Sequence, residues 1–140
     1  PARLAHCMRW LGQIEMALEM LIDRAQKRFA HGSLLSEKQS IQWMMSDSAM
    51  ELYSSKLMVL HAAYKIENGM EFKQEVSMAK HHVANTLWRV VDRAMQVHGA
   101  LGDSTDTPLA GMMQQARWAG VADGAEEVQQ RRIAEGLVEA

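Results

Sequence analysis

Asp123 is followed three positions later by Glu126, and a carboxylate at this spacing could either cap a helix or take part in acid–base chemistry. An Asp-x-x-Glu sequence in front of a helical pattern is typical of a helix N-cap, whose carboxylate accepts hydrogen bonds from backbone N–H groups of the first turn. A carboxylate that is free of such bonds could instead take a proton as a general base. The residues themselves favour the cap, and both roles place Asp123 at a junction between a loop and a helix.

Other arrangements that would support catalysis are missing from the sequence. None of the six His residues has Glu three positions before it, as a di-iron carboxylate bundle requires. The adjacent pair His81 and His82 would point its rings about 100° apart on a helix. Cys7, the single cysteine, neighbours His6 on a helical segment, where adjacent side chains do not face each other. No Ser lies in a nucleophile elbow, and residues 99–102 lack the spacing of a phosphate loop. We therefore predict neither a metal site nor a Ser or Cys nucleophile.

The composition of the 140 residues fits one compact domain, with 48% hydrophobic residues and only two Pro. A formal net charge of -2 without a block of like charges argues against nucleic acid or an anionic membrane as a partner. No apolar run reaches the roughly 18 residues of a membrane span. A single cysteine fits a reducing compartment, and we expect a cytoplasmic protein. The chain begins at Pro1 within an amphipathic pattern, so we expect residues 1–140 to be a single domain of a longer protein.

Apolar residues recur at intervals of three and four, the period of one helix face, along most of the chain. The pattern predicts long helices over residues 4–29, 36–68 and 72–98, a shorter helix over 107–118, and a last helix from 123 onward. Ser36 to Gln39 matches a capping box for the second helix, and Thr107-Pro108 an N-cap with Pro at the first helical position. No stretch alternates as a β-strand does. We expect an all-α fold, an up-and-down four-helix bundle with the last helix broken into two pieces.

Three segments, in this order, resemble the C-terminal helical domain of the flavin-dependent acyl-CoA dehydrogenases, and the resemblance extends across essentially the whole chain. Arg28-Phe29-Ala30-His31-Gly32, with Gln39 downstream, is similar to the family's Arg-Thr-x-Phe-Gly segment and its later Gln. Residues 92–100, DRAMQVHGA, look like the segment that ends in Gln-x-x-Gly-Gly. Residues 122–128, ADGAEEV, resemble the loop that carries the family's acidic base, in the subset with Asp at that position.

The resemblance implies FAD as the cofactor. Arg28 and Gln39 would help to hold its pyrophosphate and adenine, with part of the site built across a subunit interface. Gln96, Gly99 and Ala100 would meet the flavin of a neighbouring subunit. It also implies a homodimer or homotetramer.

The resemblance further implies an acyl-CoA substrate and an electron-transfer acceptor protein. Arg3 matches an Arg on the acyl-CoA side of the active site. Asp123 matches the base that removes the pro-R α-proton of the thioester while the β-hydride passes to flavin N5, which gives the trans-2-enoyl-CoA. The isolated chain, which corresponds to the last third of the family's fold, is expected to be incomplete and inactive.

Several positions depart from the family pattern. His31 stands where Phe is usual, Ala100 where a second Gly is usual, and Gly111 and Gly120 where relatives often have Arg. Ala2 takes an alternative base position known in the family and cannot serve as a base. These departures leave a second hypothesis open: a non-catalytic helical oligomerisation or interaction module derived from that domain. The four Trp residues, Trp10, Trp43, Trp88 and Trp118, would give it a contact surface if they are exposed; the alternative is that they are buried in the core.

Overall fold

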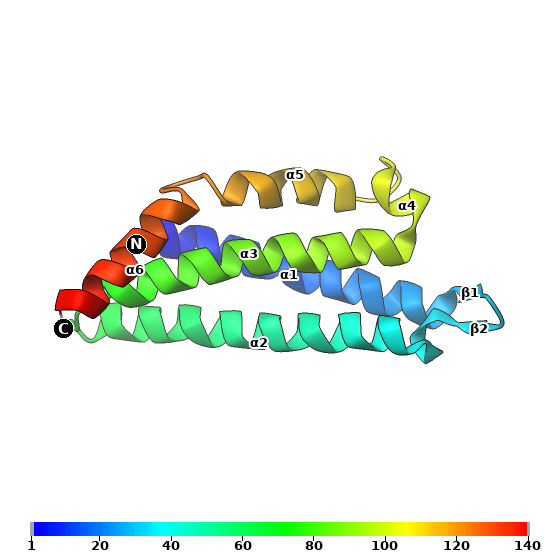
Figure 1. Ribbon diagram of the computed structural model, residues 1–140, viewed down its shortest axis with the longest axis horizontal. Coiled ribbons are helices and arrows are strands. Elements are labelled where there is room, and N and C mark those ends of the chain that lie inside the picture. The colour runs from blue at the N-terminus through cyan, green and yellow to red at the C-terminus, as the bar shows by residue number, and fades with distance from the viewer. Residues whose placement is uncertain (1, 140) are drawn as a thin grey trace.

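The computed structural model describes residues 2–139 and is built almost entirely from helices (Figure 1). The helices are α1 (Ala2–Lys27), α2 (Gln39–Glu67), α3 (Lys73–His98), α4 (Ala100–Asp103), α5 (Leu109–Ala119) and α6 (Glu126–Glu139), with a 3-10 turn over Leu35–Glu37. Two short strands, β1 (Phe29–Ala30) and β2 (Ser33–Leu34), join α1 to that turn. The predicted all-α bundle is confirmed.

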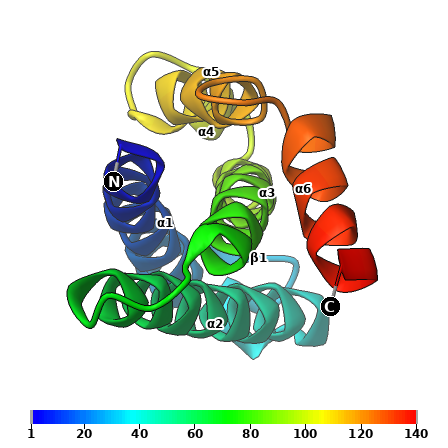
Figure 2. The same ribbon diagram turned by 90° about the vertical axis from the view of Figure 1, so that its left-hand side faces the viewer.

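Helix α3 lies at the centre of the bundle, where α1, α2, α5 and α6 all pack against it (Figure 2). Its apolar stripe, which includes Val83, Leu87 and Val90, is fully buried. Burying a side chain of this size stabilises a fold by about 1.5–3 kcal/mol relative to leaving it exposed. The broken last helix is also confirmed. Helix α5 runs along α3, and after a loop α6 packs against the N-terminal part of α3, where Gln74 donates to the carbonyl of Ile133.

Polar side chains also fix α2 to α3. The carboxylate of Glu51 on α2 accepts hydrogen bonds from Arg89 Nε at 2.9 Å and from Arg93 Nη2 at 3.0 Å. A second nitrogen of Arg93 donates to the buried hydroxyl of Ser48 at 3.2 Å. These bonds involve ionised groups and fix the register of the two helices as well as their distance.

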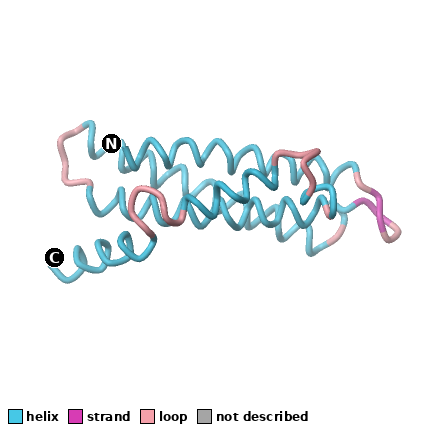
Figure 3. The backbone as a smooth tube through the Cα atoms, turned by 90° about the horizontal axis from the view of Figure 1, so that it is seen from above, coloured by secondary structure: helices cyan, strands magenta, loops and turns pink. Residues whose placement is uncertain are grey.

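The connection between α1 and α2 differs from the expectation of a helix through Phe29 and no strands. Phe29 pairs with Leu34 and Ala30 with Ser33 in a small antiparallel hairpin, which protrudes from one end of the bundle (Figure 3). His31 and Gly32 at its tip have φ of 51° and 86°, the positive values that a tight hairpin turn requires. Two-residue strands are too short to show an alternating pattern, so sequence periodicity does not predict them.

The predicted Ser36–Gln39 capping box is wrong. Glu37, not Gln39, reaches back, and its carboxylate accepts a hydrogen bond from the backbone N–H of Leu34 at 2.9 Å. This bond belongs to the 3-10 turn that precedes α2, and the N-cap of α2 is Lys38, which makes no side-chain capping bond. The polar residues that suggested one cap therefore stabilise a separate turn.

The segment 99–106, which lies between the helices predicted over 72–98 and 107–118, contains the short helix α4 (Ala100–Asp103). Gly102 makes it possible, since a Cβ there would lie 2.7 Å from the carbonyl oxygen of Met95 on α3. The backbone of α4 thus lies directly on α3. Helix α5 begins at Leu109 with Pro108 as its N-cap, one residue later than predicted. The hydroxyl of Thr107 accepts from the N–H of Leu109 at 3.4 Å. None of the helices in residues 2–139 has the length and apolarity needed to cross a membrane.

Candidate functional site

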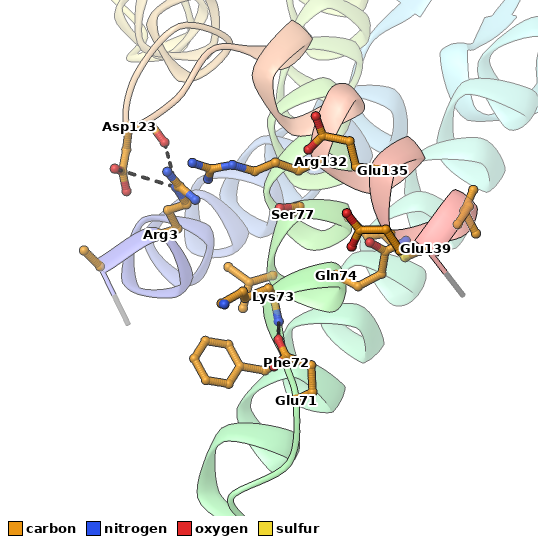
Figure 4. Close-up of a pocket in the computed structure, with 15 residues that line it drawn as sticks. Arg3, Glu71, Phe72, Lys73, Gln74, Ser77, Asp123, Arg132, Glu135 and Glu139 are labelled. Carbon is orange, nitrogen blue, oxygen red and sulfur yellow. Dashed lines mark hydrogen bonds and ion pairs between the residues drawn. The ribbon is translucent and has the colours of Figure 1, made fainter.

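Asp123 lies at the rim of a groove of about 1180 Å³ at the end of the bundle where α1 and α3 begin (Figure 4). We call it the terminal groove. It is lined by the first residues of α1, the start of α3, the loop before α6 and the outer turns of α6. Its polar lining includes Arg3, Gln74, Ser77, Asp123, Arg132 and Glu135. Charged groups of both signs and apolar residues such as Phe72 and Val76 make this groove suitable for a ligand with polar and apolar parts.

The backbone around Asp123 is left-handed, with φ of 50° at Asp123 and 97° at Gly124. Arg3 Nε donates to the backbone carbonyl of Asp123 at 3.0 Å and lies 3.8 Å from its carboxylate Oδ1. Arg3 therefore holds the loop mainly by its hydrogen bond to the backbone carbonyl of Asp123. The carboxylate of Asp123, with a side chain 33% exposed, faces Arg3 at the edge of the groove, as Figure 4 shows.

The prediction that Asp123 caps the last helix is wrong. Helix α6 begins at Glu126, and within residues 2–139 no backbone N–H donates to the carboxylate of Asp123. The expected capping partner, Glu126, instead accepts a hydrogen bond from Asn85 Nδ2 on α3 at 3.0 Å. The two left-handed residues turn the chain before the helix starts. The carboxylate of Asp123 is thereby left free of the helix end.

A second groove, of about 600 Å³, lies at the opposite end of the bundle, between the end of α1, the hairpin and the end of α3. We call it the hairpin groove. It brings together Arg28, Gln96, Gly99 and Ala100, four of the five residues that the resemblance assigns to FAD. Gln39 is exposed and does not line it, although Ser40 and Ile41 do.

Arg24, which the sequence reasoning missed, lines the hairpin groove one turn before Arg28. Its Nε is buried, and no partner for it lies in the described part of the chain. A buried guanidinium nitrogen without a hydrogen-bond acceptor is costly, and two cations at i and i+4 repel each other. An anion in the groove would relieve both penalties. The spacing of Arg24 and Arg28 was the available signal, and a diphosphate fits this pair.

The two grooves are far apart within one chain. Arg3 and Arg28 lie at opposite ends of the α1 segment, and 25 residues of helix at 1.5 Å each span about 37 Å. The terminal groove and the hairpin groove of one chain thus form two separate sites.

Two further observations bear on the chemistry. Burial raises the pKa of Cys7 to about 12, so its thiol stays protonated at neutral pH and is a poor nucleophile. No three His, Cys, Asp or Glu side chains among residues 2–139 gather as metal ligands would. The carboxylates that line the terminal groove are those of Glu71, Asp123, Glu135 and Glu139.

The chain belongs to the acyl-CoA dehydrogenase family, whose C-terminal domain model matches residues 1–138. It is 38% identical over 136 residues to a Mycobacterium tuberculosis protein named "Probable acyl-CoA dehydrogenase FadE2", covering 96% of this chain and 33% of that protein. It is 35% identical over 136 residues to acyl-CoA dehydrogenase family member 11 of Rattus norvegicus, covering 96% of this chain and 18% of that protein. The chain therefore spans a third or less of the curated relatives it matches.

Solved structures of the family share the fold. Butyryl-CoA dehydrogenase from Megasphaera elsdenii superposes with a TM-score of 0.93 at 28% identity, over 97% of this chain and 36% of that one. An acyl-CoA dehydrogenase from Geobacillus kaustophilus gives a TM-score of 0.92 at 25% identity, over 97% and 36% of the two chains. The resemblance drawn from the sequence is thus confirmed for the family and for the fold.

Proposed function

We propose that this chain is the C-terminal domain of a flavin-dependent acyl-CoA dehydrogenase that converts an acyl-CoA thioester to the trans-2-enoyl-CoA. The observation that carries the proposal is the placement of Asp123. Its carboxylate stands at the rim of the terminal groove, is not used by the N-terminus of α6, and belongs to a loop held by Arg3. A carboxylate in this position is suited to remove a proton from a bound ligand.

In this proposal the terminal groove receives the thioester end of the acyl-CoA. Asp123 takes the α-proton onto a carboxylate oxygen, and Arg3 fixes the backbone that carries it. Arg132, which lines the same groove, offers a cation for a polar part of the substrate. FAD, when bound, supplies the acceptor for the β-hydride, so that loss of a proton and a hydride leaves the α,β double bond.

The hairpin groove fits FAD through its cations and its open glycine. Arg24 and Arg28 would hold the diphosphate, and Gln96 would donate to a polar edge of the cofactor. Nothing lies within 4 Å of the position that a Cβ on Gly99 would take, so a ligand can approach the backbone there. Gln39 does not line the groove, so in this proposal it would contact FAD only at the border of the groove. Because the two grooves are separate sites in one chain, we propose that this FAD serves a neighbouring subunit.

An exposed apolar stripe on α2 supports assembly into a homodimer or homotetramer. From Met50 to Tyr64 its members recur at the spacing of three and four that is typical of helix–helix seams, and Trp43 lies seven residues, about two turns, before Met50. They are Trp43, Met50, Tyr53, Leu57, Leu60 and Tyr64, each at least 50% exposed. A continuous apolar stripe on one face of a long helix favours burial against another chain. We also propose an electron-transfer acceptor protein as the partner that reoxidises the flavin.

The alternative, a non-catalytic oligomerisation module, draws on the same stripe and on the Trp residues. Trp43, Trp88 and Trp118 are 61%, 42% and 51% exposed, whereas Trp10 is buried in the core. Such a module would keep the α2 surface and would have no use for a free carboxylate at the terminal groove. The catalytic proposal accounts for both features.

The test is Asp123→Asn in the polypeptide that carries this chain together with the other domains of the dehydrogenase. We expect turnover of acyl-CoA to fall about 10²- to 10⁴-fold, the usual contribution of a general base, with flavin content unchanged. Glu19→Gln, which alters an exposed carboxylate of α1 that lines neither groove, is the matched control and should retain turnover. Wild-type turnover by Asp123→Asn would place the base elsewhere, and a flavin-loaded wild type that oxidises no acyl-CoA would favour the module.

A further inference from the structure

Lys80 is a fully buried lysine in the middle of the apolar face of α3. Its Nζ donates to the backbone carbonyl oxygens of Ala119 at 3.0 Å and of Gly124 at 2.7 Å. It also lies 5.8 Å from the ring centroid of Trp10 on α1. Burying an ammonium group is expensive unless its hydrogens are satisfied, and here carbonyl oxygens and an aromatic face satisfy them.

The two carbonyls bound by Lys80 flank the loop that carries Asp123. Ala119 is the last residue of α5, and Gly124 directly follows Asp123. One ammonium group on α3 thus ties together both ends of the segment 120–123. Each bond alone would fix one point of the backbone, but the pair fixes the span between them.

Other contacts confirm that this loop needs external support. Asp123 and Gly124 are both left-handed, a conformation that a non-glycine residue adopts at a cost and that persists when the surroundings impose it. Gln129 Nε2 on α6 also donates to the Gly124 carbonyl, at 3.2 Å, and Arg3 donates to that of Asp123. Lys80 alone among these donors contacts both ends of the loop.

Charged groups from several elements face Lys80. Burial lowers the pKa of Lys80, and the charges of Glu126 and Asp123 oppose that effect, while Arg3 adds to it. The ammonium group therefore lies within the electrostatic reach of the candidate base as well as of its loop.

We propose that Lys80 is the positioning residue of the Asp123 loop, whose carbonyl contacts at Ala119 and Gly124 fix where the Asp123 carboxylate stands at the terminal groove. Lys80 lines neither groove and acts on the substrate only through Asp123. This inference rests on the proposed role of Asp123 as the base. It assigns to a buried residue of α3 a part in proton abstraction at the surface.

The experiment uses Lys80→Met in the full-length flavoenzyme, because Met fills similar space without the ammonium group. We expect kcat to fall about 10- to 100-fold, as a displacement of about 1 Å at a reacting group would produce, with the KM for acyl-CoA within about threefold. The isotope effect of an α-deuterated substrate should rise as proton abstraction becomes limiting. Amide hydrogen exchange should accelerate over residues 119–126 and stay unchanged in α2.

Arg93→Met is the matched control, because Arg93 is a partly buried cation of the same helix that bonds to α2 and not to the loop. It should lower the melting temperature without changing kcat or the exchange of residues 119–126. A folded, flavin-loaded Lys80→Met with kcat within twofold of wild type, or with unchanged loop exchange, overturns the inference.

Two further arms separate the ways in which this could fail. If Asp123→Asn turns over normally, the proposed base is wrong, and the loop exchange of Lys80→Met still decides whether Lys80 holds the loop. If Lys80→Met does not fold, Lys80→Gln, which keeps an amide donor, is measured in the same way and should lower kcat at constant KM. If neither folds while Arg93→Met does, Lys80 serves the fold at large and the positioning role is refuted.

Discussion

Replacing Gly124 by Ala should unfold the loop that presents Asp123 and destabilise the whole domain. Gly124 has φ of 97°, in the region that L side chains rarely adopt. A Cβ at this position would lie 2.5 Å from Gln129 Nε2 and 3.5 Å from Arg3 Nη2. Gln129 is fully buried, and the same Nε2 donates to the Gly124 carbonyl, so it cannot withdraw without losing that bond.

The two penalties can be added. The left-handed backbone costs a residue with a Cβ about 1–2 kcal/mol. Breaking the Gln129 hydrogen bond leaves a buried amide unsatisfied, which costs about 1–3 kcal/mol more. The free energy of unfolding should therefore fall by about 2–5 kcal/mol. With a denaturant slope of about 2 kcal/mol per molar urea, the unfolding midpoint should drop by roughly 1 to 2.5 M.

Urea denaturation followed by circular dichroism measures this shift, and Gly111→Ala provides the control. Gly111 lies within α5, and a Cβ there meets nothing within 4 Å. Ala is favoured over Gly inside a helix, so this variant should be stabilised by roughly 0.5–1 kcal/mol. The two Gly-to-Ala changes should thus have opposite signs. A Gly124→Ala variant as stable as the parent would refute the account of the loop given above.

Acid should weaken the contact between α2 and α3. Burial tends to raise the pKa of Glu51, but hydrogen bonds and charges of Arg93 and Arg89 outweigh it and hold the pKa below the usual 4.5. A folded-state pKa below the unfolded value gives stability that is present above that value and lost as pH falls through the folded pKa. Urea unfolding of Glu51→Gln, measured from roughly pH 3 to 6, should show a free energy of unfolding that depends less on pH than in the parent. An unaltered pH dependence would contradict the role of Glu51. A Leu57→Glu, Leu60→Glu double variant should shift sedimentation toward the monomer, unlike Met8→Glu on α1, and an intact assembly would exclude the α2 stripe as an interface.

The long helices were predictable because their cause is local. The apolar residues of α1, α2 and α3 repeat at helical spacing, and each helix must bury that stripe against another. Gly69, with φ of 65° just after α2, and Gly99, with the same φ just after α3, end helices where the sequence placed them. The family resemblance also rested on short segments of sequence in order, so it needed no tertiary contact.

The errors fall where the backbone is set by distant residues. The spacing of Asp123 and Glu126 indicated a cap, yet the chain turns left-handed at Asp123 because Arg3, Gln129 and Lys80 hold its carbonyls from three other helices. Lys80 did leave a signal in the sequence, since it lies four residues after Val76 and three before Val83, among apolar positions of α3. A charged residue on a buried face calls for a partner, but the sequence does not say which.

The sequence by itself determined the helices, the bundle and the family, because these follow from local periodicity and from short motifs. Only the tertiary structure decided that Asp123 is free of the α6 N-terminus, that Arg24 joins Arg28 in the hairpin groove, and that the two grooves lie at opposite ends of α1. The grooves, and the hydrogen bonds of Lys80 to the carbonyls of Ala119 and Gly124, are made by residues far apart in the chain. Their geometry depends on how the helices pack, which no local spacing records.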